Sequence, residues 1–391
     1  MTDFEARTGR LRSRLAAGTA AVASDPANVR WLTGLAGEPH QLYGMAPVLA
    51  IVGPHGGVRI VAPASELAWI DDLRGLDGVI SHGSFVLGGR PRPALGAGAG
   101  AGRGFGDAIS QALRELDATG AAIFDDGGRP SAFDELRRHL HRRSLRIDPE
   151  PWLHARAVKD ADEVAALRRV NAVAEAAISV ALARATVGTR ELDLLRWVRE
   201  EMVDHGARPL LGSIGIGERG ALVDFAPGTR SLGRGEAIRL DVGCVLDGYH
   251  ADLARTAVLD EPPEWLIAAH DALLAGQEAA LVATRAGATG AGVFAAAIAA
   301  TRAAGLRDYE RLHCGHGIGL DMYEPPLIRP DSTEMIRAGM TCCIETPLYL
   351  IGRAGVQIED AVVVTNDGCE RLGALPRALL VAGDEVDAVT R

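Results

Sequence analysis

The sequence contains few cysteines and few aromatic residues for its length. Its 391 residues include five cysteines, an odd number without a CxxC pair, and only 4% are Phe, Trp or Tyr. This cysteine usage argues against a disulfide framework and is typical of reduced thiols. We therefore expect a cytoplasmic protein whose cysteines belong to the core. The scarcity of aromatics accompanies an abundance of Ala and Gly and carries no functional information.

Net positive charge and long apolar runs are lacking as well. With 41 basic and 51 acidic residues the formal net charge is −10, whereas nucleic-acid binding needs a basic face. No stretch reaches the roughly 18 uninterrupted apolar residues that a membrane span needs. Asp3 and Glu5 precede the first arginine, which does not suit a signal peptide. Neither nucleic acid nor a membrane is expected as a partner.

Length and composition predict two globular domains. A chain of 391 residues exceeds one average domain, and 48% apolar residues suffice for sizeable cores. Residues 1–150 have the pattern of an α/β domain, and Pro149 and Pro151 mark its end. The elements expected in it are a helix over 5–17, extended segments over 46–53, 58–63 and 121–126, a Gly- and Pro-rich loop over 88–106 and a basic helix over 133–143.

Two segments of the second domain, residues 155–391, have the same form. Residues 187–206 and 286–305 each run from a Gly-containing turn through a helix to a closing Gly, with an offset of 99 residues. Each follows another long helix, the first of which begins near Asp162. Chance similarity is one explanation, because the identities are few. A weak internal repeat is the other, and it predicts two halves facing each other across a cleft.

Two aspartates lie on opposite arms of a predicted hairpin. The residues around Asp241 alternate as in a strand, and Asp247-Gly248 is a strong two-residue turn signal. Pairing across that turn brings 241–243 opposite 252–254, and therefore Asp241 close to Asp252. Two buried carboxylates this close require a compensating cation. The hairpin alone leaves a surface location with solvated acids as an equal alternative.

Three more candidate metal ligands follow in the same domain. His316 stands between glycines in a Gly-rich loop, where a single histidine is more often structural; Glu345 and Glu359 interrupt apolar, strand-like segments. Either glutamate alone could form an ion pair. With the two aspartates, however, the five residues are best satisfied by metal. Carboxylates with one imidazole suit two ions of Mn²⁺ or Co²⁺, with Zn²⁺ or Fe²⁺ as alternatives.

These motifs resemble the metal signature of the pita-bread metallopeptidases, which include Xaa-Pro dipeptidase, aminopeptidase P, methionine aminopeptidase and creatinase. The order and spacing match, with 11 residues from Asp241 to Asp252, 29 from His316 to Glu345 and 14 from there to Glu359. The resemblance implies that all five bind metal, with Asp252 and Glu359 bridging two ions. It also makes Glu345 the residue that passes a proton from water to the leaving amine.

The resemblance extends over the whole chain and implies its fold. Residues 10–35 are similar to the opening of the family's creatinase-like N-terminal domain, and residues 155–170 to the helix that opens its catalytic domain. The fold class is thus α/β, with a creatinase-like α/β domain followed by a pseudo-twofold, pita-bread α+β catalytic domain. A homodimer is implied too, in which the N-terminal domain reaches towards the partner's cleft.

Two positions depart from the family pattern. The family's peptidases carry one histidine after the ligand histidine, in an H-E-x-P segment, and another before the first aspartate. Tyr323 and Asp224 stand at these places here. Their numbers differ by the repeat offset of 99, so we expect them to face each other across the substrate. Tyr323 can donate a hydrogen bond to the scissile carbonyl, whereas an ionised Asp224 cannot.

Two enzymatic interpretations remain open. The chain is a hydrolase of a dipeptide or of the N-terminal amide of a short peptide, or it is a non-peptidase amidohydrolase in which Asp224 recognises a cationic or cyclic amide. A non-catalytic binding scaffold is a third hypothesis, against which the complete ligand set argues. His250 and His313 are candidates for lining the substrate site, with packed or exposed histidines as the alternative. Gln357 shares a face with Glu359 and is expected to orient that carboxylate.

Overall fold

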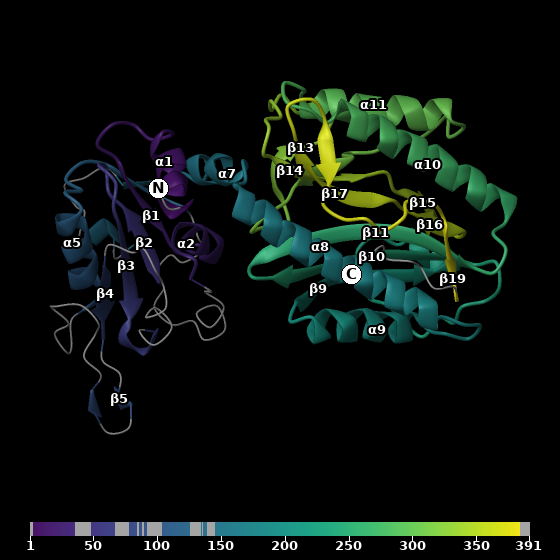
Figure 1. Ribbon diagram of the computed structural model, residues 1–391, viewed down its shortest axis with the longest axis horizontal. Helices are drawn as coiled ribbons and strands as arrows, with labels where there is room; N and C mark the ends of the chain where they lie inside the picture. Colours follow the sequence, from purple (N-terminus) through teal and green to yellow (C-terminus); the bar gives the residue numbers. More distant parts are fainter. Residues whose placement is uncertain are drawn as a thin grey trace. The chain divides into compact units, whose positions relative to one another are not determined.

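The chain divides into two compact units. A computed structural model describes residues 3–35, 48–66, 78–83, 86–87, 90–91, 104–125, 134, 136–138 and 145–383. The first unit is Met1–Arg156 and the second is Ala157–Arg391, and both appear in Figure 1. Most of the loop predicted over 88–106 and most of the basic helix predicted over 133–143 lie outside the described residues, although residues 134 and 136–138 are helical.

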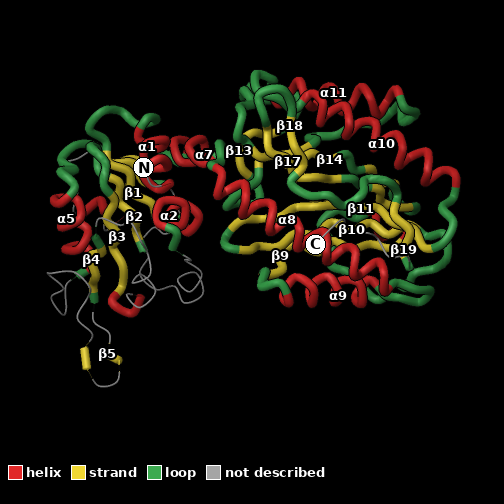
Figure 2. The backbone as a smooth tube through the Cα atoms, in the orientation of Figure 1, coloured by secondary structure: helices red, strands yellow, loops and turns green. Residues whose placement is uncertain are grey.

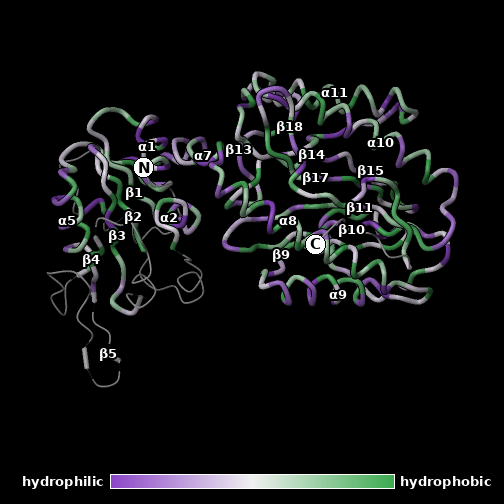
Figure 3. Tube along the Cα trace, viewed as in Figure 1, coloured by the Kyte–Doolittle hydropathy of each residue, from purple (hydrophilic) through white to green (hydrophobic). Residues whose placement is uncertain are grey.

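The first unit is a mixed sheet with helices beside it (Figure 2). Its strand order is β4-β3-β2-β1-β7-β8, in which β2 pairs antiparallel with both neighbours and the remaining pairs are parallel. Hydrophobic residues gather along β1 to β3 (Figure 3). The elements are α1 (Asp3–Arg12), β1 (Ala20–Ala23), α2 (Pro26–Thr33), β2 (Leu49–Val52), β3 (Val58–Pro63), η1 (Ala64–Glu66), β4 (Val79–His82), β5 (Val86–Leu87), β6 (Arg90–Pro91), α5 (Phe105–Glu115), β7 (Ala122–Phe124), β8 (Leu145–Ile147) and α7 (Glu150–Arg156).

The strands of this unit follow the sequence prediction more closely than its first helix does. The extended segments expected over 46–53, 58–63 and 121–126 contain β2, β3 and β7. The helix expected over 5–17 is wrong at its C-terminal end, because α1 stops at Arg12. The chain must reverse there to enter β1, and it does so through Gly18, whose φ of 77° favours glycine.

The second unit contains a nine-stranded sheet, in which seven strands follow the order β13-β12-β14-β17-β11-β10-β9. Strand β18 adds to β17, and β19 adds to β11. Helices α8 and α9 pack against β9, β10 and β11, whereas α10 contacts β14 and β16 (Figure 1). The elements are α8 (Ala161–Arg184), α9 (Glu191–Asp204), β9 (Arg208–Ile216), η2 (Gly217–Ala221), β10 (Ala237–Leu246), β11 (Tyr249–Leu259), α10 (Glu264–Ala283), α11 (Gly290–Ala303), β12 (Gly315–Gly317), β13 (Glu324–Leu327), β14 (Thr341–Glu345), β15 (Leu348–Leu350), β16 (Ala354–Val356), β17 (Glu359–Val364), β18 (Cys369–Arg371) and β19 (Leu380–Ala382).

The internal repeat is confirmed by the helix pairs. Helices α9 and α11 have 14 residues each, and their first residues, Glu191 and Gly290, are separated by the predicted offset. Each follows a left-handed glycine, Gly188 or Gly287, with φ near +90°. The turns also make matching hydrogen bonds to a later segment, since both glycine amides donate to a backbone carbonyl there. The two segments therefore repeat the same backbone geometry at equivalent positions, although few of their residues are identical.

The two halves of the repeat meet at one pair of strands. In the sheet order, β12, β14 and β17 of the later half continue directly into β11, β10 and β9 of the earlier half. Ala254 on β11 pairs with Glu359 on β17. A buried ion pair reinforces the junction, because Arg255 Nη2 lies 2.7 Å from Asp360 Oδ1 and Arg255 Nη1 donates to the Glu359 carbonyl. This strand pair is called the seam below.

Helix α10 belongs to the core of the second unit. By length and composition it is the one described helix apolar enough to cross a membrane, although Asp271 and Glu278 interrupt it. Its Leu266, Leu273 and Ala280 are fully buried in a hydrophobic cluster shared with α11, β14 and β17. Core packing therefore accounts for its apolar face.

We predict that Gly276→Val destabilises the second unit by about 2–3 kcal/mol, because overpacking a tight contact is costly. A Cβ at Gly276 would collide with Thr301 Oγ1 and lie 3.0 Å from the Ala297 carbonyl of α11. Urea unfolding followed by circular dichroism measures the change. Asp271→Val is the matched control, since it adds the same side chain to the same helix at an exposed position. Equal stability of the two variants would contradict the prediction.

Candidate metal centre

The predicted hairpin is confirmed in its turn and its register. Strands β10 and β11 are joined by Asp247 and Gly248, both with positive φ, as a two-residue turn requires. Asp241 pairs with Ala254, and Gly243 pairs with Asp252. Residues two apart along a strand share a face, so both carboxylates project from the same face of the sheet.

His316 lies on a short strand, so its predicted location in a loop was wrong. Strand β12 pairs with β13 on one side and with β14 on the other. The flanking glycines allow these approaches, because a Cβ at Gly315 would collide with the Cys343 carbonyl and one at Gly317 with the Pro325 carbonyl. His316 is 1% exposed, and its Nδ1 is 3.0 Å from the Gly317 carbonyl oxygen. A donor Nδ1 leaves Nε2 as the lone-pair nitrogen.

The two glutamates face each other across neighbouring strands. Glu345 ends β14, Glu359 begins β17, and the two are register partners. Because Glu359 also pairs with Ala254, it lies on the same face as Asp252 across the seam. The sheet thereby gathers four carboxylates and one imidazole, which the sequence spreads over more than a hundred residues.

Three of these side chains and the thiol of Cys343 form a donor set for a metal ion. Ligand atoms of Asp252, His316, Cys343 and Glu359 all lie within 4.8 Å of one another. Asp252 is 5% exposed, and its Oδ1 has no hydrogen-bond partner among the described residues. A buried carboxylate oxygen without a donor is costly unless a cation binds it. The chemistry of this set therefore fits a divalent ion.

Burial and mutual repulsion oppose the ionisation of three of the acids. Burial raises the pKa of Asp241 to about 7, although the Arg239 guanidinium counteracts it. Burial and then neighbouring carboxylates raise the pKa values of Asp252 and Glu359 well above the ordinary range. These shifts mean that the cluster, without added cations, holds protons that a bound metal would displace.

The pKa values of Glu345 and His316 are lowered, in contrast to those of the three acids above. Burial opposes ionisation of Glu345, yet nearby His313 and His316 hold its pKa below the usual value. His313 Nδ1 lies 3.1 Å from Glu345 Oε1. Burial lowers the pKa of His316, so its imidazole is neutral at pH 7, the form that binds metals. The site thus has an ionised carboxylate beside an imidazole, a pair suited to proton transfer.

Tyr323 and Asp224 both lie near the acids. The Tyr323 ring stacks on His316 with centroids 3.7 Å apart, and the residue is 58% exposed. Burial of the phenol and the surrounding acids raise its pKa, so it stays a hydrogen-bond donor. Asp224 is exposed, with φ of 46°, and its charge raises the pKa values of Asp241 and Asp252. It has no ion-pair or hydrogen-bond partner among the described residues.

His250 lies on the same strand face as Asp252, but it adjoins the segment that contains Gly319 and Asp321. Its backbone amide donates to the Gly319 carbonyl, and its Nδ1 is buried without a partner in the described part of the chain. Burial lowers the pKa of the ring. Asp321 and Glu324 are the acids that act on it most strongly, so the prediction that it lines the substrate site stays untested.

Three residues at or beside the site escaped the sequence prediction. Cys343, expected only as a core residue, contributes its thiol to the donor set, and Arg239 lies 3.3 Å from Asp241 Oδ2. Each lies two residues from a predicted ligand on the same strand face, and this spacing is the sequence signal that could have identified them.

Lys159 forms a buried ion pair with Glu324 at 2.7 Å, and this anchors the segment that carries Tyr323. No local pattern links positions so far apart in sequence.

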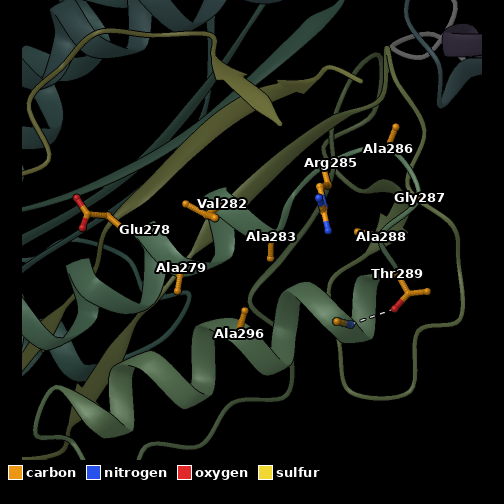
Figure 4. A pocket seen from close by; sticks show the side chains of 11 residues that line it. Glu278, Ala279, Val282, Ala283, Arg285, Ala286, Gly287, Ala288, Thr289 and Ala296 are labelled. Carbon is orange, nitrogen blue, oxygen red and sulfur yellow. Dashed lines mark hydrogen bonds between the residues drawn. The ribbon is translucent and has the colours of Figure 1, made fainter. Parts of the chain in front are cut away.

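A hollow of about 840 Å³ lies elsewhere, on the outer side of α10 and α11 (Figure 4). Small side chains such as Ala279, Ala283 and Ala296 line it, together with the charged Glu278 and Arg285. The Thr289 hydroxyl caps α11 there by accepting a hydrogen bond from the Gly292 amide. None of the predicted site residues lines this hollow.

Known proteins match both the sequence and the fold. The model of metallopeptidase family M24 matches residues 165–366. An Xaa-Pro dipeptidase of Pyrococcus furiosus is 30% identical over 227 residues, 58% of this chain and 65% of that protein. A probable dipeptidase PepE of Mycobacterium tuberculosis is 33% identical over 228 residues, 58% of this chain and 61% of the relative. The matched region thus spans less than two thirds of each relative's length.

Solved structures resemble the chain over nearly its full length. An X-Pro aminopeptidase from Thermotoga maritima superposes with a TM-score of 0.81 at 21% identity, covering 95% of this chain and 99% of that one. Dipeptidase PepE from Mycobacterium ulcerans gives 0.76 at 26% identity, with 97% and 99% covered. The fold is therefore the pita-bread α/β fold of prolidases and aminopeptidase P, with a buried acidic cluster on its sheet. Since the family model matches more than half of the residues, the chain belongs to metallopeptidase family M24.

Proposed function

We propose that this protein is a dinuclear-metal hydrolase that cleaves a dipeptide or the N-terminal amide of a short peptide. The observation that carries the proposal is the convergence of four carboxylates and His316 on one sheet face, with an unpartnered, buried oxygen on Asp252. The names of the two curated relatives, both dipeptidases, point to the same substrate class. The residues proposed to hold two ions are Asp241, Asp252, His316, Glu345 and Glu359.

The proposed chemistry divides between the ions and the protein. When bound, divalent ions supply Lewis acidity and a nucleophile at neutral pH, and the carboxylate-rich ligands favour Mn²⁺ or Co²⁺. Glu345 accepts the proton of the attacking water and passes it to the leaving amine, and His313 at 3.1 Å keeps that carboxylate ionised between turnovers. The neutral Tyr323 phenol donates a hydrogen bond towards the scissile carbonyl.

Hydrolysis of a substrate panel tests the proposal. The panel contains Xaa-Pro dipeptides, other dipeptides and small cyclic or guanidino amides, with Mn²⁺ or Co²⁺ restored after chelation. Metal-dependent turnover of dipeptides is the expected result. Two bound ions with no activity on any peptide would move the proposal to a non-peptide amide. A protein that binds no metal would leave only the non-catalytic scaffold.

The second candidate, an amidohydrolase of a cationic amide, is favoured by Asp224 alone. Its charge acts on Asp241 and Asp252, and it has no partner among the described residues, so a substrate cation is free to pair with it. We predict that Asp224→Ala lowers kcat/KM for a cationic amide about tenfold or more, since a charged hydrogen bond contributes about 1.5–3 kcal/mol. Neutral dipeptides should change less than about threefold. Steady-state kinetics on matched cationic and neutral substrates measures both, and equal losses on both would contradict charge recognition.

We also propose a homodimer in a thiol-reducing compartment such as the cytoplasm. All five cysteines are free, four of them buried, which supports reduced thiols. Light scattering on the purified protein tests the dimer.

A further inference from the structure

The guanidinium of Arg239 is buried beside the metal centre. Arg239 lies on β10, two residues before Asp241, and is 1% exposed. Its Nη1 is 3.3 Å from Asp241 Oδ2 and 2.8 Å from Gln357 Oε1, and its Nη2 donates to the Leu222 carbonyl at 2.8 Å. The Tyr349 ring covers it, with the Cζ atom 5.2 Å from the ring centroid. Partners from four segments therefore fix one cation against the acid cluster.

The contact with Gln357 determines which way that amide points. An arginine has only donors, so the Gln357 atom that meets it must be the carbonyl oxygen. The amide nitrogen is thereby turned towards the acids, and Nε2 lies 3.4 Å from both Glu345 Oε2 and Glu359 Oε2. Without the guanidinium, nothing among these contacts would stop the amide from rotating its oxygen towards two carboxylates.

We infer that Arg239 is a positioning residue for the metal centre, acting directly on Asp241 and, through the amide of Gln357, on Glu345 and Glu359. The inference rests on the proposed function, because it assumes that these carboxylates hold metal. One buried cation thus aligns three of the five proposed ligands, which come from three different strands. Partners that orient ligand side chains commonly change metal affinity by about 10–100-fold.

Lysine cannot replace this arginine. The guanidinium donates from two nitrogens in one plane, to Asp241 and Gln357 on one side and to Leu222 on the other, whereas an ammonium is a single point of charge. Arg239→Lys therefore keeps the charge but loses the geometry, and Arg239→Met loses both. Gln357→Met removes the relay to the glutamates and leaves the Arg239 contact with Asp241 in place.

The test is Mn²⁺ affinity, measured on the full chain by competition with a chromophoric chelator, together with the visible absorption spectrum of the Co²⁺-loaded protein. We expect Arg239→Lys and Gln357→Met to weaken Mn²⁺ binding at least tenfold and to alter the Co²⁺ spectrum, which reports the ligand geometry. Arg234→Lys is the matched control, since Arg234 is exposed and, among the described residues, forms an ion pair with Asp260 alone. It should bind as the unaltered protein does.

The outcomes separate the inference from the proposed function. If the unaltered protein binds no Mn²⁺ or Co²⁺, the proposed function fails. If it binds two ions and Arg239→Lys and Gln357→Met bind them within twofold, with an unchanged Co²⁺ spectrum, the positioning role is overturned. The relay is tested by the double variant, whose loss should be smaller than the product of the single losses. Should an Arg239 variant not fold, Gln357→Met alone decides, because it leaves the buried arginine hydrogen-bonded.

Discussion

Replacing Glu345 with glutamine is expected to lower kcat/KM by about 10³-fold, because general acid–base groups contribute roughly 10²–10⁴-fold. Glutamine keeps the size of the side chain and an oxygen that can still contact a metal ion, but it cannot accept a proton at neutral pH. The nearby His313, at 3.1 Å, would then have a neutral amide in place of its anionic partner. The measurement is steady-state hydrolysis of the best dipeptide by metal-saturated protein.

Two controls make that result specific to proton transfer. Metal content, determined on the same sample by mass spectrometry, separates a lost proton acceptor from a lost metal ligand. Glu310→Gln changes an exposed glutamate in the segment that leads to His313, and it should retain activity within about twofold. If fully loaded Glu345→Gln kept more than a tenth of the activity, Glu345 would not be the proton carrier.

Removing the metal is expected to lower the Tm of the second unit on the order of 10 °C at pH 7. Ligand at a thousand times its Kd stabilises a protein by about 4 kcal/mol, and a unit of this size shifts by a few degrees per kcal/mol. The buried acids add to this effect, because without ions they must either hold protons or repel one another. Differential scanning calorimetry with chelator, and then with Mn²⁺ restored, measures the shift.

The metal-free protein should also lose stability as the pH rises. The pKa of Asp241 is about 7 in the folded chain, above its ordinary value of 3.8. A carboxyl with a raised folded pKa stabilises the fold fully below its unfolded pKa, and this contribution disappears as pH rises through the folded value. Between about pH 4 and pH 7 the loss from this group is up to about 4 kcal/mol.

Bound Mn²⁺ should abolish most of that slope, since the ions compensate the charges that protons otherwise remove. Asp241→Asn should flatten the slope in the metal-free protein, as the amide does not titrate. A metal-free Tm that stays constant from pH 5 to pH 8 would contradict the raised pKa of these buried acids. The pH series is best run on calorimetry samples dialysed against chelator.

Local patterns predicted that the sheet brings Asp241 and Asp252 together, because the signals around these two residues are local. Alternation along β10 and the Asp247-Gly248 turn set the register that places Asp241 beside Asp252. The site itself depends on pairing between strands that are far apart in the sequence. His316 lies on a strand only because β13 and β14 pair with a three-residue, glycine-flanked segment, and nothing within that segment indicates a strand.

Cys343, Arg239 and Lys159 are not among the predicted site residues, for two different reasons. Cys343 and Arg239 stand two residues before Glu345 and Asp241 on their strands, so the same alternation that orients the ligands also orients them. Neither is distinctive in the sequence, because a cysteine and an arginine in an apolar strand have common structural explanations. The Lys159–Glu324 pair could not be predicted, because it joins residues 165 positions apart.

The position of the seam bears on how this centre arose. Asp241 and Asp252 belong to the first copy of the repeat, and Glu345 and Glu359 to the second, with β11 and β17 adjoining at the boundary. A protein with a single copy of the repeat would contain only some of the residues proposed to bind metal. Such an ancestor would have completed the centre by pairing with an identical molecule, and gene duplication with fusion would have made that association permanent. In a fused chain each copy can change independently, so the two halves need not contribute the same residue types to the centre.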